Sequence, residues 1–367
     1  MDPQITSGYS PSTPTKPSSP ELALDESFLR VLGPIPLEFP QDLGAHREYL
    51  TEWWYYTGNL TSDEGRQFGF QLTFFRRGIL SPRLHPDRKS PWATGQVYLA
   101  HLALSDIDTG QFIFDERITR EAINLAGATG SPLKIWLYNW KIESTDPNVY
   151  QLAATTQRVQ LSLIMEDVKG ITLQGDQGFS PKGTQVGNAS IYFSQTRLKT
   201  QGNITLDGRT HTVRGTSWMD HEFSTSALSE NQVGWDWFAL QLDNGIEIMV
   251  YTIRKANGAI DPFSSGKIIF ADGSGLPLSF NQFEIQVLDT WQSPHSNAVY
   301  PSRWKISIPE NRIELSVTPL MADQELNLSF IYWEGAIKIA GIFSGEPVEG
   351  RGYAELTGYA VPFRGDF

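Results

Sequence analysis

The chain has 367 residues, which is long enough for two domains, and it is 40% hydrophobic but only 19% charged. Its net charge of −12 argues against a nucleic-acid partner and against an anionic membrane surface, because both would repel it. The chain contains no cysteine, which excludes disulfides, thiolate catalysis and cysteine-ligated zinc or iron–sulfur sites.

The N-terminal segment, residues 1–35, is predicted to be a disordered or extended arm, because it opens with a stretch rich in Ser, Thr and Pro. A short helix is expected near its end, over residues 20–32. The arm has neither a basic start nor an apolar run, so no signal peptide is predicted. No apolar run of the chain approaches the roughly 20 residues that a membrane helix needs. We therefore expect a soluble, cytoplasmic protein of bacterial origin.

Two β-hairpins are predicted from alternation and turn residues. "EWWYYTGNL" leads through the turn "TSDEGR" into "RQFGFQLTFFRR", and "GWDWFALQL" leads through "DNG" into "IEIMVYTIR". Further strands are expected in "KIWLYNWKIE", "YQLAATTQRVQLSLIME" and "NRIELSVTPL". A few helical turns are expected around residues 114–126. The 12% aromatic content with 32 Gly and 22 Pro also favours an all-β protein.

The two hairpins resemble each other, and so do the segments that end each half of the chain. "IYF" at residues 191–193 matches "IYW" at 331–333, and "GTSWMD" at 215–220 matches "GRGYAE" at 350–355, which pairs Asp220 with Glu355. We therefore predict two tandem antiparallel β-barrel or β-sandwich domains related by internal duplication, over residues 36–225 and 226–367. Closing or stacking the sheets would remove exposed edges.

The stretch "GTSWMDHEFS" places three titratable side chains in a row. On a strand, Trp218, Asp220 and Glu222 share one face, and His221 points to the other. A carboxyl beside Trp in a low-dielectric pocket has a raised pKa and can act as a general acid. Asp220 is the predicted acid if its face is the inner one, and His221 if the other face is. Alternatively, these residues tie the two halves together through hydrogen bonds.

Aromatic residues open both hairpins, at Trp53, Trp54, Tyr55, Tyr56, Trp235, Trp237 and Tyr251. Most are expected to fill cores, but rings can also line a pocket for an apolar ligand or stabilise a carbocation. Glu52 and Asp236 are charges among bulky apolar residues. They either take part in a site or form buried salt bridges, with Arg76 or Arg254 as partners.

The motifs do not support a metal site, a serine hydrolase, an NTPase or a dinucleotide-binding enzyme. "HEFST" lacks the second His of a zinc-protease helix, and the six His are scattered, so no metal site is predicted. The chain has no Gly-x-Ser-x-Gly elbow, P-loop or dinucleotide fingerprint. We therefore expect no cofactor.

Several of these stretches together resemble one family. "EWWYYTGNL", "FGFQLTFFR", "SWMDHEFS", "GWDWFALQLDNG", "YPSRWKISIP", "YWEGA" and "GYAELTGY" are similar to the AttH-like, hydroxyneurosporene synthase family, over residues 48–359. This family includes carotenoid 1,2-hydratases and proteins described as secreted hydrolases, and it is distantly related to fungal Diels–Alder cyclases. The resemblance implies two packed lipocalin-like β domains.

The resemblance also implies a chemistry, in which an acid protonates an alkene and water captures the carbocation. It assigns the acid to Asp220, with Trp218 on the same strand face. The hydratases carry a His-x-Trp pair on the preceding strand, where this chain has Ile191, Tyr192 and Phe193. Tyr192 replaces that His only if its side chain points inward.

The expected partner is thus a hydrophobic, unsaturated small molecule of carotenoid, terpenoid or polyene type. The expected substrate-binding residues are Trp218, Tyr192, Trp53, Trp54, Trp235, Trp237, Tyr251 and Glu52, around the catalytic Asp220 and His221. Hydration, pericyclic cyclisation and simple carriage of an apolar ligand all stay open, and substrate could be collected through a peripheral membrane contact. No oligomeric state is predicted.

Overall fold

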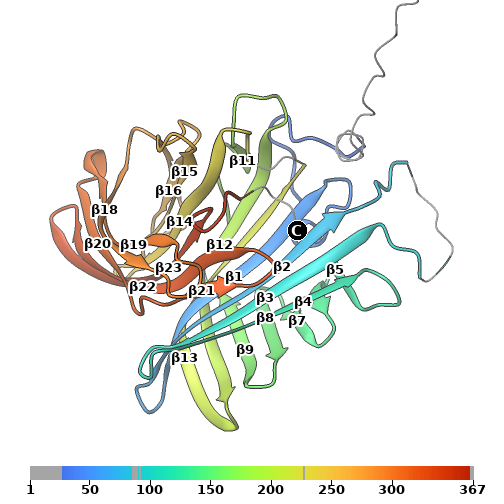
Figure 1. The fold of residues 1–367 in the computed structure, drawn as a ribbon, viewed down its shortest axis with the longest axis horizontal. Helices are drawn as coiled ribbons and strands as arrows, with labels where there is room; N and C mark the ends of the chain where they lie inside the picture. Colours follow the sequence, from blue (N-terminus) through green and yellow to red (C-terminus); the bar gives the residue numbers. More distant parts are fainter. Residues whose placement is uncertain (1–26, 85–89, 91, 226–227, 364–367) are drawn as a thin grey trace, which may run out of the picture.

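Two large, curled antiparallel sheets make up the protein in the computed structural model, which describes residues 27–84, 90, 92–225 and 228–363 (Figure 1). The first sheet has 13 strands and the second has 10. The prediction of an all-β protein is therefore confirmed, and strands account for 62% of the described residues.

The first sheet runs in the order β4-β3-β2-β1-β13-β12-β9-β8-β7-β6-β5, with β10 and β11 paired to β12. Its strands are β1 (Thr51–Ser62), β2 (Gln67–Gly78), β3 (Gln96–Asp106), β4 (Gln111–Arg120), β5 (Ala126–Gly130), β6 (Leu133–Leu137), β7 (Trp140–Asp146), β8 (Val149–Thr155), β9 (Val159–Asp167), β10 (Ile171–Leu173), β11 (Phe179–Pro181), β12 (Ala189–Leu206) and β13 (Arg209–Ser224).

The second sheet runs in the order β17-β16-β15-β14-β23-β22-β20-β19-β18, with β21 paired to β22. Its strands are β14 (Gln232–Leu242), β15 (Glu247–Lys255), β16 (Ser265–Ile269), β17 (Gly275–Ser279), β18 (Glu284–Gln292), β19 (Val299–Ile308), β20 (Ile313–Pro319), β21 (Glu325–Asn327), β22 (Ile331–Phe343) and β23 (Glu346–Thr357). The chain thus passes from one sheet to the other between Ser224 and Gln232.

The internal duplication predicted from sequence is visible in the strand order. In the first sheet β1 lies between β2 and β13, and in the second β14 lies between β15 and β23. The register is equivalent as well, because Tyr55 is opposite Asp220 and Trp237 is opposite Glu355. The two acids matched by sequence therefore occupy the same place in each half.

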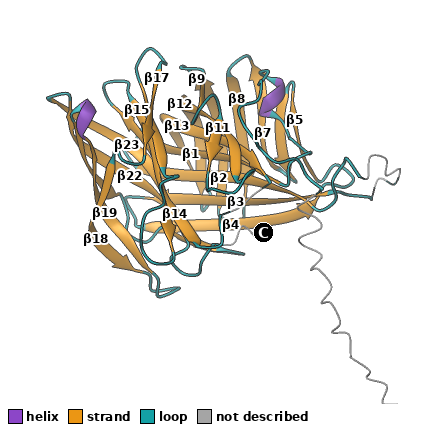
Figure 2. Cartoon of the chain, turned by 90° about the horizontal axis from the view of Figure 1, so that it is seen from above, coloured by secondary structure: helices purple, strands orange, loops and turns teal. Residues whose placement is uncertain are grey.

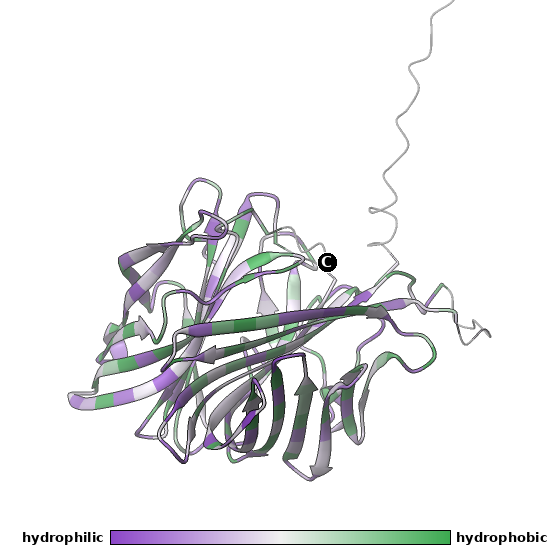
Figure 3. Cartoon of the chain, turned by 60° about the horizontal axis from the view of Figure 1, so that its bottom comes forward, coloured by the Kyte–Doolittle hydropathy of each residue, from purple (hydrophilic) through white to green (hydrophobic). Residues whose placement is uncertain are grey.

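Each sheet encloses its own apolar core, and a third cluster joins them. Residues alternate between buried and solvent-facing along strands such as β9, and the banding of hydropathy along the strands in Figure 3 reflects this period of two. At the end of β13, from Ser217 to Ser224, every residue is buried, because both faces of the strand are covered. One face packs into the first core, and the other packs in the cluster between the sheets, which includes Tyr55, Trp218 and Trp237.

The sequence predicts more helix than the described residues contain. The expected helix at 20–32 lies outside the described residues up to residue 26, and residues 27–32 are not helical. Residues 114–126 continue β4 and lead into β5, because β4 pairs with β3 along its whole length. Helical geometry in the described residues is limited to two short 3-10 turns, η1 (Gln41–Leu43) and η2 (Pro309–Asn311), purple in Figure 2.

Two of the predicted strands each prove to be a hairpin. "YQLAATTQRVQLSLIME" folds as the hairpin β8–β9. "KIWLYNWKIE" folds as the hairpin β6–β7, with Tyr138 in left-handed geometry at the turn. Within the described part of the chain, no helix has the length and apolarity required to cross a bilayer.

Candidate active site

A cavity of about 140 Å³ lies between the two sheets. Aromatic rings from both halves form much of its wall: Trp53 and Tyr55 from β1, Tyr192 from β12, Trp235 and Trp237 from β14, and Tyr251 from β15. Trp53 and Tyr55 both point into the cavity because they are two residues apart on one strand, and the same holds for Trp235 and Trp237. The repeated "W-x-[YW]" pattern therefore builds one pocket from two equivalent strands.

Asp220 lies in the wall of this cavity and is almost completely buried, with 4% of its surface exposed. Its carboxyl group accepts hydrogen bonds from Tyr192 Oη at 2.7 Å, Ser194 Oγ at 2.5 Å and Trp218 Nε1 at 2.7 Å. Trp237 Nε1 in turn donates to Tyr192 Oη at 3.1 Å. Asp220 is thus fixed in one orientation by three uncharged donors.

Burial without a counter-charge controls the ionisation of this group. Removal from water raises the pKa of Asp220 to about 7, although its three hydrogen bonds act in the opposite direction. A carboxyl group of this kind is protonated in part of the molecules at neutral pH. It can therefore give a proton to a bound molecule and take it back.

Three further carboxyl groups share the cavity: Glu222, Glu334 and Glu355. Glu222 forms an ion pair with Lys182 at 3.1 Å. Burial raises the pKa of Glu355 to about 8 and that of Glu334 well above its ordinary value, and the hydroxyl of Tyr55 donates a hydrogen bond to Glu334. The second half of the molecule thus contributes neutral carboxylic acids to the same cavity.

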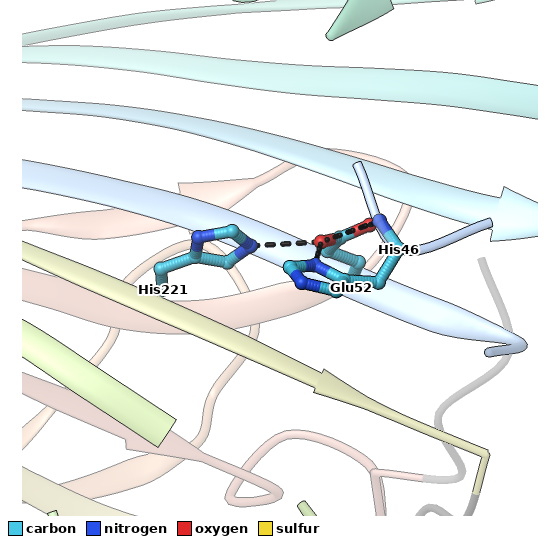
Figure 4. Close-up of side chains that lie close together, drawn as sticks. All are labelled: His46, Glu52 and His221. Atoms are coloured by element: carbon cyan, nitrogen blue, oxygen red, sulfur yellow. Dashed lines mark hydrogen bonds and ion pairs between the residues drawn. The ribbon is translucent and has the colours of Figure 1, made fainter. Parts of the chain in front are cut away.

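The other face of the same strands carries a different polar cluster, made of the buried Glu52, His221 and Arg76 and the partly buried His46. Figure 4 shows Glu52 with the two histidines. Glu52 accepts from Arg76 Nε at 2.7 Å, from His221 Nε2 at 2.8 Å and from His46 Nδ1 at 2.8 Å. Burial opposes ionisation of Glu52, but Arg76 and His46 lower its pKa below its ordinary value. The predicted salt bridge between Glu52 and Arg76 is confirmed, as is the one between Asp236 and Arg254 at 2.9 Å.

Three residues of this cluster could hold a metal ion by their spacing, because one ligand atom from each of His46, Glu52 and His221 lies within 4.8 Å of the others. Two imidazoles and a carboxylate are a donor set that zinc accepts. However, the guanidinium of Arg76 already neutralises Glu52 and occupies one of its oxygens. The arrangement fits an ion-pair network inside the first core better than a cation site.

The structure therefore divides the residues that the sequence singled out. One cavity is lined by Asp220, Tyr192, Trp53, Trp235, Trp237 and Tyr251. Trp218 contributes by donating a hydrogen bond to Asp220. Glu52, Trp54 and His221 are turned to the opposite face, because each lies an odd number of residues from a cavity-facing residue on its strand. None of the three lines the cavity, so the structure does not bring them together with the other predicted site residues. Trp54 is a core residue whose indole donates to the carbonyl of Leu43 at 2.9 Å.

Several cavity residues were not predicted as site residues: Tyr55, Glu222, Tyr332, Glu334 and Glu355. The repeat contained the signal for two of them, Tyr332 and Glu355. Its alignment of Tyr192 with Tyr332 and of Asp220 with Glu355 places both members of each pair at equivalent strand positions. What the alignment could not show is that both halves face one shared cavity.

Comparison with known proteins agrees with this architecture. The AttH-like family model matches residues 30–359, so the chain belongs to the AttH-like family. A crystal structure of an AttH-type protein from Nitrosomonas europaea is 35% identical, covers 90% of this chain and 100% of its own, and superimposes with a TM-score of 0.80. A search of curated proteins gave no significant match.

Two more distant structures share the fold. Kievitone hydratase from Nectria haematococca is 16% identical, covers 91% of this chain and 98% of its own, and has a TM-score of 0.69. CghA is 11% identical, covers 90% of this chain and 95% of its own, and has a TM-score of 0.56.

Proposed function

We propose that the protein is an enzyme that adds water to the double bond of an apolar small molecule, with Asp220 as the proton donor. The observation that supports this most strongly is the environment of Asp220. It is a carboxylic acid whose pKa is raised to about 7, and it lies in the wall of a cavity lined by indole and phenol rings. Kievitone hydratase, which shares the fold, is named for a hydration.

The aromatic wall suits the intermediate of such a reaction. Protonation of an alkene leaves a carbocation, and ring faces attract cations through their quadrupoles. Trp53, Tyr55, Trp235 and Trp237 would surround this charge. The carboxylate of Glu222 also lines the cavity, where the ammonium of Lys182 at 3.1 Å balances its charge.

The size of the cavity limits what can react in it. An apolar cavity of about 150 Å³ holds a benzene-sized molecule, and this cavity measures about 140 Å³. It therefore takes the reacting end of a substrate, or a small unsaturated molecule as a whole. A long polyene would place only its terminus beside Asp220.

Tyr192 also favours hydration over cyclisation. The hydratases carry a His-x-Trp pair on this strand, and Tyr192 meets the condition for replacing that His, because its side chain points inward and donates to Asp220. Its hydroxyl can equally accept from a protonated Asp220 and then present its own proton to the cavity.

The experiment uses two probes that form tertiary carbocations, α-methylstyrene and 2-methylhept-2-ene. We expect wild-type protein to convert at least one of them to the tertiary alcohol, detected by mass spectrometry in H₂¹⁸O. Asp220→Asn should lose about 10²- to 10⁴-fold in rate, the usual contribution of a general acid. Binding of both probes without any product would indicate a carrier, and a product of unchanged mass would indicate migration of the double bond without capture of water. Either result would overturn the proposal.

A further inference from the structure

A chain of three hydrogen-bonded side chains leads from the cavity to the protein surface. Tyr332, on β22 of the second sheet, lines the cavity and is 2% exposed. Its hydroxyl is 2.8 Å from Nδ1 of His101, which is on β3 of the first sheet and fully buried. His101 Nε2 is 2.9 Å from Glu116 Oε2, and the side chain of Glu116 is 22% exposed. The chain therefore crosses from one sheet to the other.

The direction of each hydrogen bond follows from the chemistry of the groups. Glu116 is a carboxylate that accepts from His101 and also from the backbone N–H and the hydroxyl of Ser329, at 3.1 and 2.6 Å. Because a carboxylate only accepts, Nε2 of His101 carries the proton. Nδ1 of a neutral imidazole then accepts, so the hydroxyl of Tyr332 donates to it.

The charge state of His101 agrees with this assignment. Burial lowers the pKa of His101, although Glu116 opposes that change, and the hydrogen bond from His101 lowers the pKa of Glu116 to about 2. At neutral pH the pair is therefore a neutral imidazole beside a carboxylate. Such a pair increases the basicity of the group that donates to it, as in other catalytic relays.

The oxygen of Tyr332 thus has lone pairs left over after donating to His101. One of them receives a weak hydrogen bond from Gln71 Nε2 at 3.4 Å. Since Tyr332 lines the cavity, a further lone pair is available to a water molecule there.

We infer that Tyr332 is the base that takes the proton from the water added to the substrate, with His101 and Glu116 as its positioning residues. This inference rests on the proposed hydration. Asp220 would act from the first sheet and Tyr332 from the second, so each sheet supplies one half of the reaction. The relay also provides a histidine in place of the His-x-Trp pair that the strand ahead of Asp220 lacks.

Hydration then forms one C–H bond and one C–O bond. The π electrons of the alkene take the proton of Asp220 to form a C–H bond, which leaves a cation on the adjacent carbon. A lone pair of water forms the C–O bond there, and the proton of the resulting oxonium passes to Tyr332 Oη as the phenolic proton moves to His101 Nδ1. The Nδ1 proton of His101 then returns to Tyr332 Oη, and Tyr332 gives up its other proton through water to the carboxylate of Asp220, so that each group regains its starting proton. One H and one OH, from water, are added in total.

The test separates protonation from water capture by using α-methylstyrene in D₂O. Protonation by Asp220 followed by return of a proton leaves deuterium in the alkene, whereas capture gives 2-phenylpropan-2-ol. Both products are measured by NMR in the same sample. We expect Tyr332→Phe and His101→Asn to lose about a hundredfold in alcohol formation, a typical contribution of a general base, while deuterium incorporation persists. Asp220→Asn should lose both.

Tyr98→Phe is the matched control. Tyr98 is a buried tyrosine on β3, three residues before His101, and its hydroxyl has no hydrogen-bond partner among the described residues. This variant should keep both activities. The inference would be overturned if Tyr332→Phe formed the alcohol as fast as Tyr98→Phe does. It would also be overturned if Tyr332→Phe lost deuterium incorporation and alcohol formation to the same extent. If wild-type protein shows neither activity, the proposed function itself fails, which is a different outcome.

Discussion

Two carboxyl groups, Asp220 and Glu52, are buried on opposite faces of the same pair of strands, β1 and β13. Asp220 faces the cavity and accepts hydrogen bonds only from uncharged donors among the described residues, so burial raises its pKa to about 7. Glu52 faces the first core, where burial is opposed by Arg76 and His46, which lower its pKa below the ordinary value. One group is an acid that can give up a proton near neutral pH, and the other is a permanent anion.

The comparison shows that burial alone does not decide the state of a carboxyl group. The counter-charge decides it, because an ion removed from water must be compensated by a partner or become neutral. Since neighbouring residues on a strand face opposite sides, the protein places a carboxyl group with a raised pKa at Asp220 and a structural network at His221, one residue later.

The largest effect should come from removing the counter-charge on the core side. Arg76→Met leaves Glu52 buried without its guanidinium partner, and we expect a loss of about 3–5 kcal/mol in the free energy of unfolding. Urea denaturation measures this. The double variant Arg76→Met with Glu52→Gln should recover part of the loss, because no unpaired anion remains. A double variant as unstable as the sum of both single changes would contradict a paired Glu52.

The pH dependence of the free energy of unfolding should distinguish Asp220, on the cavity side, from the cluster around Glu52 on the core side. The folded-state pKa of Asp220 is about 7, above its ordinary value of 3.8, so between these pH values only the unfolded chain releases the proton. Stability therefore falls as pH rises through this window, by up to about 1.4 kcal/mol per pH unit. Asp220→Asn should lack this term and gain stability relative to wild type between pH 4 and about pH 7, as measured by denaturation across this range. A constant difference would contradict a raised pKa.

The core side should respond to pH in the opposite sense. Burial lowers the pKa of His221 to about 4, so the unfolded chain binds a proton between its ordinary value of 6.5 and about 4 while the folded chain does not. Stability from this group therefore falls as pH decreases through that window. In the same measurements, the free energy of unfolding of His221→Gln should fall less than that of wild type as the pH decreases through this window. An equal fall in both proteins would contradict a neutral, buried His221.

Smaller changes in stability and in probe binding should distinguish the variants of two adjacent tryptophans, Trp53 and Trp54. Trp54→Phe removes the hydrogen bond to Leu43 and should cost about 1 kcal/mol of stability without changing probe binding. Trp53→Phe should leave stability nearly unchanged but weaken binding of α-methylstyrene, because only Trp53 lines the cavity. Denaturation and fluorescence titration of both variants provide the comparison, and identical behaviour of the two would contradict the assignment of faces.

Much of the fold could be predicted from the sequence. The hairpins at β1–β2 and β14–β15 follow from alternation and turn residues, and the repeat predicts the shared strand order. The helical turns expected at residues 114–126 were wrong, because the residues up to Arg120 pair with β3 instead.

The site was predictable only in part. Alternation indicates that Asp220 and Trp218 share a face and that His221 does not, but it does not show which face meets the other sheet. Glu52 and Trp54 were misplaced for this reason. The link from Tyr332 to His101 joins residues 231 positions apart on different sheets, and nothing local in the sequence marks such a contact.

The most direct test of the central claim is the pKa of Asp220 itself. Carbon-13 NMR of protein labelled at the aspartate carboxyl carbons, with Asp220→Asn for assignment, follows this one group through a titration. We predict a midpoint near pH 7, consistent with a desolvated acid in the cavity wall. A midpoint near the ordinary value of 3.8 would mean that Asp220 is an ordinary carboxylate at neutral pH and would contradict its role as a proton donor.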